Sequence, residues 1–114
     1  MAKLETLIYG EFDQLLYVIE NGILSGSISA SLEAGSDFAY DHARCAVRVF
    51  ERYSWSGSNR VSLNVTLFEA EEGKIHVSGI ASGGSQAAFL KINTWGEENF
   101  LEELRQILCH YPNY

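Results

Sequence analysis

The chain has 114 residues, 46% of them hydrophobic, and a formal net charge of −7. This length fits a single domain over residues 1–114, because a chain of this size buries roughly two-thirds of its unfolded surface. The negative charge argues against a nucleic-acid partner, since binding to phosphates depends on cations that displace counterions. No apolar stretch approaches the roughly 18–20 residues of a membrane-spanning helix, so no membrane partner is expected either.

The cysteine content indicates the compartment. The two cysteines, Cys45 and Cys109, lie far apart in the sequence, and no opening run of basic and then apolar residues indicates a secretion signal. We therefore expect free thiols in a reducing cytoplasm.

The first part of the chain predicts a strand, a helix and another strand. Residues 3–9 are typical of a short strand, and residues 11–21 have the period of an amphipathic helix. The apolar stripe of that helix consists of Phe12, Leu15, Leu16 and Ile19. Strict alternation predicts a half-buried strand over residues 27–33. The segment up to His42 fits a loop or an edge strand.

The second part predicts a run of strands followed by a helix. Four segments are rich in aliphatic and aromatic residues and predict strands: 44–55, 60–69, 74–82 and 85–92. A helix is expected to begin at Thr94, which has capping-box spacing to Glu97, and to end before Pro112. The expected fold is α+β: an antiparallel sheet of five or six strands in a meander, with an N-terminal and a C-terminal helix packed on one face.

Turn chemistry predicts which side chains share a face. A two-residue turn at Gly83-Gly84 and three-residue loops at 57–59 and 71–73 align the apolar faces of the strands. These glycines are most simply explained by a hairpin turn, because Ser85 lacks the motif of a nucleophile or a phosphate loop. In this register Val49 lies opposite Leu67, on the face that the helices cover.

The predicted apolar face contains small residues that leave volume to be filled. Either side chains from the helices fill it while Glu51 reaches water, or a small apolar ligand occupies a pocket there. The residues of this candidate pocket are Glu51, Tyr53, Gly79, Gln86 and Ala88. The pocket would make the protein a small carrier of an apolar or lipid-like ligand beneath the C-terminal helix.

The opposite face is predicted to gather basic and aromatic side chains. They are Arg48, Phe50, Arg52, Phe68, His76, Phe89 and Lys91. Solvated side chains are one interpretation, but three phenylalanines exceed the scattered exposure of an ordinary surface. The preferred interpretation is a symmetric homodimer that forms through this face.

No pattern for catalysis or metal binding emerges. His42, His76 and His110 have no metal-ligand spacing to one another or to the cysteines, so neither a metal nor another cofactor is expected. Enzymatic activity is disfavoured, because no local pattern places a base beside a nucleophile. The preferred function is a non-enzymatic binding or interaction domain.

Four stretches resemble a bacterial family of short, uncharacterised proteins: "GILSGSISASLE", "ARCAVRVFERYS", "NRVSLNVTL" and "GGSQAAFLKINTWGEENFL". The resemblance implies a bacterial cytoplasmic setting and no particular activity. More loosely, the element order is similar to the helix-grip (START/Bet v1-like) superfamily of lipid-binding proteins, although the usual second early helix is missing. Such a likeness concerns the fold and does not establish a function.

Overall fold

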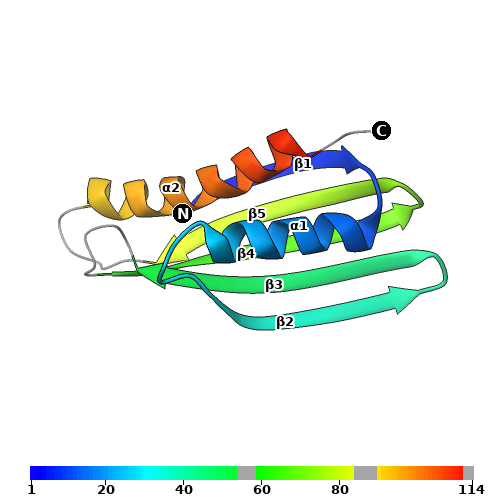
Figure 1. The fold of residues 1–114 in the computed structure, drawn as a ribbon, viewed down its shortest axis with the longest axis horizontal. Coiled ribbons are helices and arrows are strands. Elements are labelled where there is room, and N and C mark those ends of the chain that lie inside the picture. The colour runs from blue at the N-terminus through cyan, green and yellow to red at the C-terminus, as the bar shows by residue number, and fades with distance from the viewer. Residues whose placement is uncertain (54–58, 84–89, 112–114) are drawn as a thin grey trace.

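The computed structural model describes residues 1–53, 59–83 and 90–111, without the side chains of residues 90–95. The elements are β1 (Ala2–Tyr9), α1 (Phe12–Ser25), β2 (Ser31–Tyr40), β3 (Ala43–Tyr53), β4 (Arg60–Glu71), β5 (Lys74–Gly83) and α2 (Leu90–His110). They form one five-stranded antiparallel sheet with both helices on one face, as Figure 1 shows. The predicted α+β class is therefore confirmed.

The sheet has the strand order β1-β5-β4-β3-β2. Strands β2 to β5 follow one another as a meander, and β1 pairs with β5 at the far edge. The segment that fitted a loop or an edge strand belongs to β2, which forms the other edge. The strand predicted over residues 27–33 begins only at Ser31, and Ile28 is fully exposed. Figure 1 shows β2 extending beyond both helices.

The strand predicted over residues 85–92 is wrong where the structure describes it. Residues 90–92 form the first turn of α2, and residues 84–89 lie outside the described ranges together with most of the predicted hairpin. The physical reason lies elsewhere in the chain. The side of β5 that this strand would occupy is paired with β1 from Ala2↔Ala81 to Tyr9↔Lys74.

The hydrophobic core lies between the sheet and the two helices. The helices contribute Phe12, Leu15, Ile19 and Ile23 from α1, and Phe100, Leu101, Leu104 and Leu108 from α2. Burial of each such side chain contributes about 1.5–3 kcal/mol, so these two stripes hold the helices on the sheet.

Two glycines allow close packing in this core. A Cβ atom at Gly79 of β5 would lie 2.4 Å from Leu104 Cδ2, and one at Gly22 of α1 would lie 2.5 Å from Ile107 Cδ1. The volume predicted at Gly79 is therefore filled by side chains of α2. The first helix continues past the predicted end at residue 21 to Ser25, and the absence of a side chain at Gly22 lets α2 approach closely there.

The observed register of β3 differs from the predicted one, so its side chains point to the opposite faces of the sheet. Leu67 pairs with Val77 as predicted, but Phe50 pairs with Leu63. Tyr53 pairs with Arg60, so the connection between β3 and β4 has six residues rather than three. Because successive side chains alternate between faces, this odd difference moves every side chain of β3 to the other side of the sheet.

Candidate functional site

The observed register of β3 places Arg44, Arg48 and Arg52 beneath the helices. These three residues, the arginine ladder, are spaced by four positions along β3 and therefore share one face at intervals of roughly 13 Å. The sequence prediction placed Arg48, Phe50 and Arg52 on the solvent-facing side of the sheet. That placement is wrong, since Phe50 is 0% exposed and each of these arginines contacts carboxylates around the covered face.

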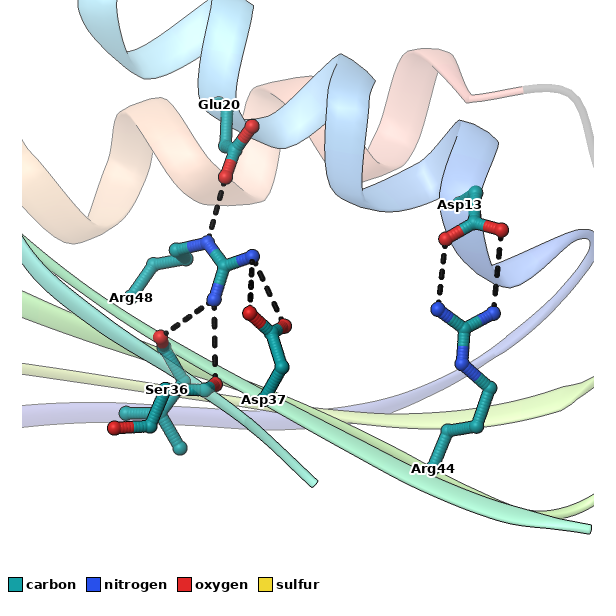
Figure 2. A network of polar contacts seen from close by, with 7 residues as sticks. Asp13, Glu20, Ser36, Asp37, Arg44 and Arg48 are labelled. Carbon is teal, nitrogen blue, oxygen red and sulfur yellow. Dashed lines mark hydrogen bonds and ion pairs between the residues drawn. The ribbon is translucent and has the colours of Figure 1, made fainter. Parts of the chain in front are cut away.

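Arg48 connects three parts of the fold (Figure 2). Its Nε lies 2.6 Å from a carboxylate oxygen of Glu20 in α1, and its Nη2 lies 3.0 Å from Asp37 in β2. Its Nη1 donates a hydrogen bond of 2.9 Å to the carbonyl oxygen of Val47. Burial alone lowers the pKa of Arg48, but the hydrogen bonds to Glu20 and Asp37 outweigh it and raise this pKa above its usual value.

The other two arginines contact one helix each. The guanidinium of Arg44 binds both carboxylate oxygens of Asp13 in α1, at 2.8 and 3.2 Å, and lies 4.1 Å from the ring centroid of Phe12. Arg52 pairs with Glu103 of α2 and stacks on Phe100, where burial lowers its pKa. Carboxylates of the same chain thus neutralise all three cations, and the ion pairs of the arginine ladder connect the helices to the sheet.

The Asp13–Arg44 pair predicts a pH dependence of stability. The hydrogen bond from Arg44 lowers the pKa of Asp13 in the folded state, so its contribution is present above the unfolded value of about 3.9 and is lost as the pH falls through the folded value. Urea unfolding should therefore show Asp13→Asn less stable than wild type at pH 7, by at most about 1 kcal/mol for so exposed a pair. Once the pH has fallen below the folded pKa of Asp13, the two proteins should converge. A difference that persists there would show that the charge of Asp13 is not its cause.

The opposite face of the sheet, the open face, is covered by neither helix. The strand registers align its side chains in rows across all five strands. One row runs from β1 to β2 through Leu7, His76, Phe68, Cys45 and Phe38. The adjacent row has smaller and more polar side chains, namely Glu5, Ser78, Thr66, Val47 and Ser36. The open face therefore has a largely apolar ridge beside a lower polar strip.

Large apolar side chains are concentrated on the open face. Seven of them are between 36% and 82% exposed: Leu7, Tyr9, Phe38, Tyr40, Tyr53, Phe68 and Ile80. Together they expose on the order of 700 Å², if a whole aromatic side chain counts about 200 Å². The largest apolar patch of an ordinary monomer is about 300–600 Å², so this surface has the extent of an interaction site.

A shallow depression lies beside the apolar ridge. It has a volume of about 440 Å³, and its lining includes Glu5, Thr66, Phe68, His76 and Ser78. The ring centroids of Phe68 and His76 are 6.4 Å apart. The depression therefore has aromatic side chains on one side and polar groups on the other, and both kinds of group are common in protein–protein interfaces.

The open face is close to neutral, unlike the rest of the molecule. Its cations are Lys3, Arg60 and Lys74, and its anions are Glu5, Glu33, Glu51 and Glu71, which gives a charge of −1. The remaining −6 of the net charge of −7 therefore belongs to the rest of the chain. Two such faces can approach each other with little repulsion, whereas two strongly acidic surfaces cannot.

The predicted interface is assembled in part. Phe68 and His76 are neighbours on the open face, while Arg48, Phe50 and Arg52 lie on the covered side. Phe89 is outside the described residues, and Lys91 belongs to α2 with an undescribed side chain. The sequence interpretation missed Leu7, Tyr9, Phe38 and Tyr40. Their signal is spacing by two along β1 and β2, which follows once both segments are known to be strands.

The predicted pocket is not brought together. Glu51 and Tyr53 lie on the open face, where Glu51 contacts Arg60 and Ser62, whereas Gly79 faces α2 on the other side. The positions assigned to Gln86 and Ala88 lie outside the described residues. Within the described part of the chain, no cluster of side chains could hold a metal ion, and no helix is long and apolar enough to span a membrane.

Comparison with known proteins gives one result. A model described as "Family of unknown function (DUF6054)" matches residues 1–112. No curated protein and no solved structure matches the chain. The likeness to the helix-grip superfamily therefore stays a prediction.

Proposed function

Because the chain belongs to DUF6054, a family of unknown function, its role must be argued from its surfaces, and we propose a non-enzymatic interaction domain that self-associates through its open face. The observation that carries this proposal is the uncovered sheet face with seven large, exposed apolar side chains. A two-fold symmetric contact between two copies covers both faces at once.

Area and charge support a second copy as the partner. The exposed apolar area on the order of 700 Å² approaches the roughly 800 Å² that each partner contributes to a standard interface. The near-neutral open face limits repulsion between copies, while the acidic helix side would oppose the same contact. Aromatic residues at its centre, such as Phe68, are of the type that dominates binding energy.

Sedimentation equilibrium of a charge-insertion variant tests the proposal. The wild type should have a two-chain mass at micromolar concentration, and Phe68→Asp should be a monomer, because a carboxylate would be buried without a partner at the centre of the contact. Tyr17→Asp is the control, since Tyr17 is 68% exposed on α1, and this variant should remain a dimer. Circular dichroism should show that both variants are folded. A monomeric wild type at micromolar concentration would overturn the proposal.

A carrier of an apolar ligand is less well supported. Its candidate residues Glu51 and Gly79 lie on opposite faces of the sheet, and Leu104 occupies the space beside Gly79. The cytoplasm remains the proposed compartment, because Cys45 and Cys109 are both free thiols, which suit a reducing environment.

A further inference from the structure

The two edges of the sheet differ in how they are protected against pairing with another strand. An unpaired edge strand offers backbone donors and acceptors to other chains, and proteins guard such edges with bulges and charges. The edge strand β2 has both, because its register shifts between Leu32 and Ala34 and it carries Glu33 and Asp37. Two copies of β2 would bring acidic side chains together.

The edge strand β1 has no bulge, and its two charged residues, Lys3 and Glu5, have opposite signs. It pairs with β5 in one unbroken register over all eight residues, Ala2–Tyr9, and contains neither glycine nor proline. Beside it runs a groove of about 270 Å³, whose lining includes Leu4, Leu7, Leu108 and Cys109. This edge is therefore regular and next to apolar surface that another strand could cover.

The charges of β1 are complementary to those of a second β1. Lys3 and Glu5 project from the same face on either side of Leu4, and both are well exposed, with Lys3 Nζ 3.9 Å from Glu5 Oε2. In an antiparallel pair with Leu4 opposite its own copy, Lys3 lies directly opposite the partner's Glu5. The two-fold symmetry forms this pair twice, and each directly opposed pair of unlike charges favours the contact.

Other registers lack this match. The helix-covered faces of the two copies lie on the same side of the joined sheet only if one residue pairs with its own copy across the two-fold axis. Pairing at Glu5 places two carboxylates together, and pairing at Lys3 places two ammonium groups together. Pairing at Thr6 leaves Lys3 opposite the partner's Tyr9. Charge therefore favours the register centred on Leu4.

We infer that β1 is a second self-association site, at which two copies join their sheets edge to edge in the Leu4 register. This contact goes beyond the proposed function, because it uses a strand edge rather than the open face. It is smaller than the face contact, so it belongs among the weak interfaces below roughly 1,200 Å² and forms at higher protein concentration.

Charge reversal in the Phe68→Asp background tests this inference without the face contact. Sedimentation equilibrium at high concentration should show a two-chain species for Phe68→Asp. Adding Lys3→Glu or Glu5→Lys should weaken that association roughly tenfold or more, because two attractive pairs become repulsive. An equimolar mixture of the two reversed proteins should associate as well as the parent, since the mixed pair opposes glutamate to lysine on both sides.

The control is Glu98→Lys, an exposed change on α2 that alters net charge as much as Glu5→Lys does and should not weaken association. The inference would be overturned if the mixture of the Lys3→Glu and Glu5→Lys proteins associated no better than either protein by itself. It would also be overturned if Phe68→Asp stayed monomeric at every concentration. The two proposals fail separately. If the face contact does not exist, Phe68→Asp will leave the mass of the wild type unchanged. If the edge contact does not exist, Lys3→Glu and Glu5→Lys will leave the association of Phe68→Asp unchanged.

Discussion

Replacing Phe50 with alanine is expected to lower the free energy of unfolding by about 3–5 kcal/mol. Phe50 is 0% exposed, pairs with Leu63 of β4 and lies on the helix-covered face between Arg48 and Arg52. Its removal leaves a cavity on the covered face, and the neighbouring side chains of Arg48 and Arg52 are held by ion pairs to the helices, so they cannot readily move to fill it. Urea denaturation followed by circular dichroism measures the loss.

The matched control is Phe38→Ala, the same change on the open face. Phe38 is 66% exposed at the edge of the sheet, so its truncation should lower the free energy of unfolding by less than about 1 kcal/mol. Both variants should be measured at low protein concentration, where self-association contributes little to stability. Equal losses in the two variants would mean that β3 does not present Phe50 to the core, and the register of this strand would have to be revised.

The sequence identifies the elements that depend on local patterns. The α+β class follows from it, as do the apolar stripe of α1 and the register between β4 and β5. The turn has two residues, Glu72 and Gly73 (φ +84°), rather than the predicted three, and a register shift between Phe68 and Glu71 restores the predicted pairing. Because Phe68 and His76 lie on these two strands, they are the members of the predicted interface that the structure places together.

The face of β3 cannot be read from its sequence. One side carries Ala46 and Phe50 among the arginines, and the other carries Val47 and Val49, so neither side is clearly apolar. Arginine on a covered face contradicts the usual pattern of burial. The carboxylates that make it possible come from Glu20 and Glu103, on helices distant in the sequence.

The edge of β5 is another case in which distant residues decide. The sequence predicts a strand over residues 85–92, but residues 90–92 belong to α2, because a short apolar run alone does not distinguish a strand from a buried helix. The choice depends on whether the edge of β5 is free. Strand β1, some seventy residues earlier in the chain, already occupies that edge.

The second large effect is expected at Arg48. Arg48→Met should lower the free energy of unfolding by about 2–3 kcal/mol, because methionine keeps the apolar stem while Glu20 and Asp37 lose a charge-assisted partner. The matched control is Arg44→Met. The Arg44 side chain is 39% exposed against 13% for Arg48, so the loss of its ion pair should amount to at most about 1 kcal/mol.

A double-mutant cycle separates the ion pair from packing. If the guanidinium holds α1 through Glu20, Glu20→Gln and Arg48→Met together should destabilise the fold by clearly less than the sum of the single changes, with a coupling above about 1 kcal/mol. Additive losses would mean that Arg48 acts through its stem or through Asp37 alone. Because Asp37 lies on the edge strand β2 and Glu20 on α1, the cycle also determines whether β2 is held by the helix layer or only by its pairing with β3.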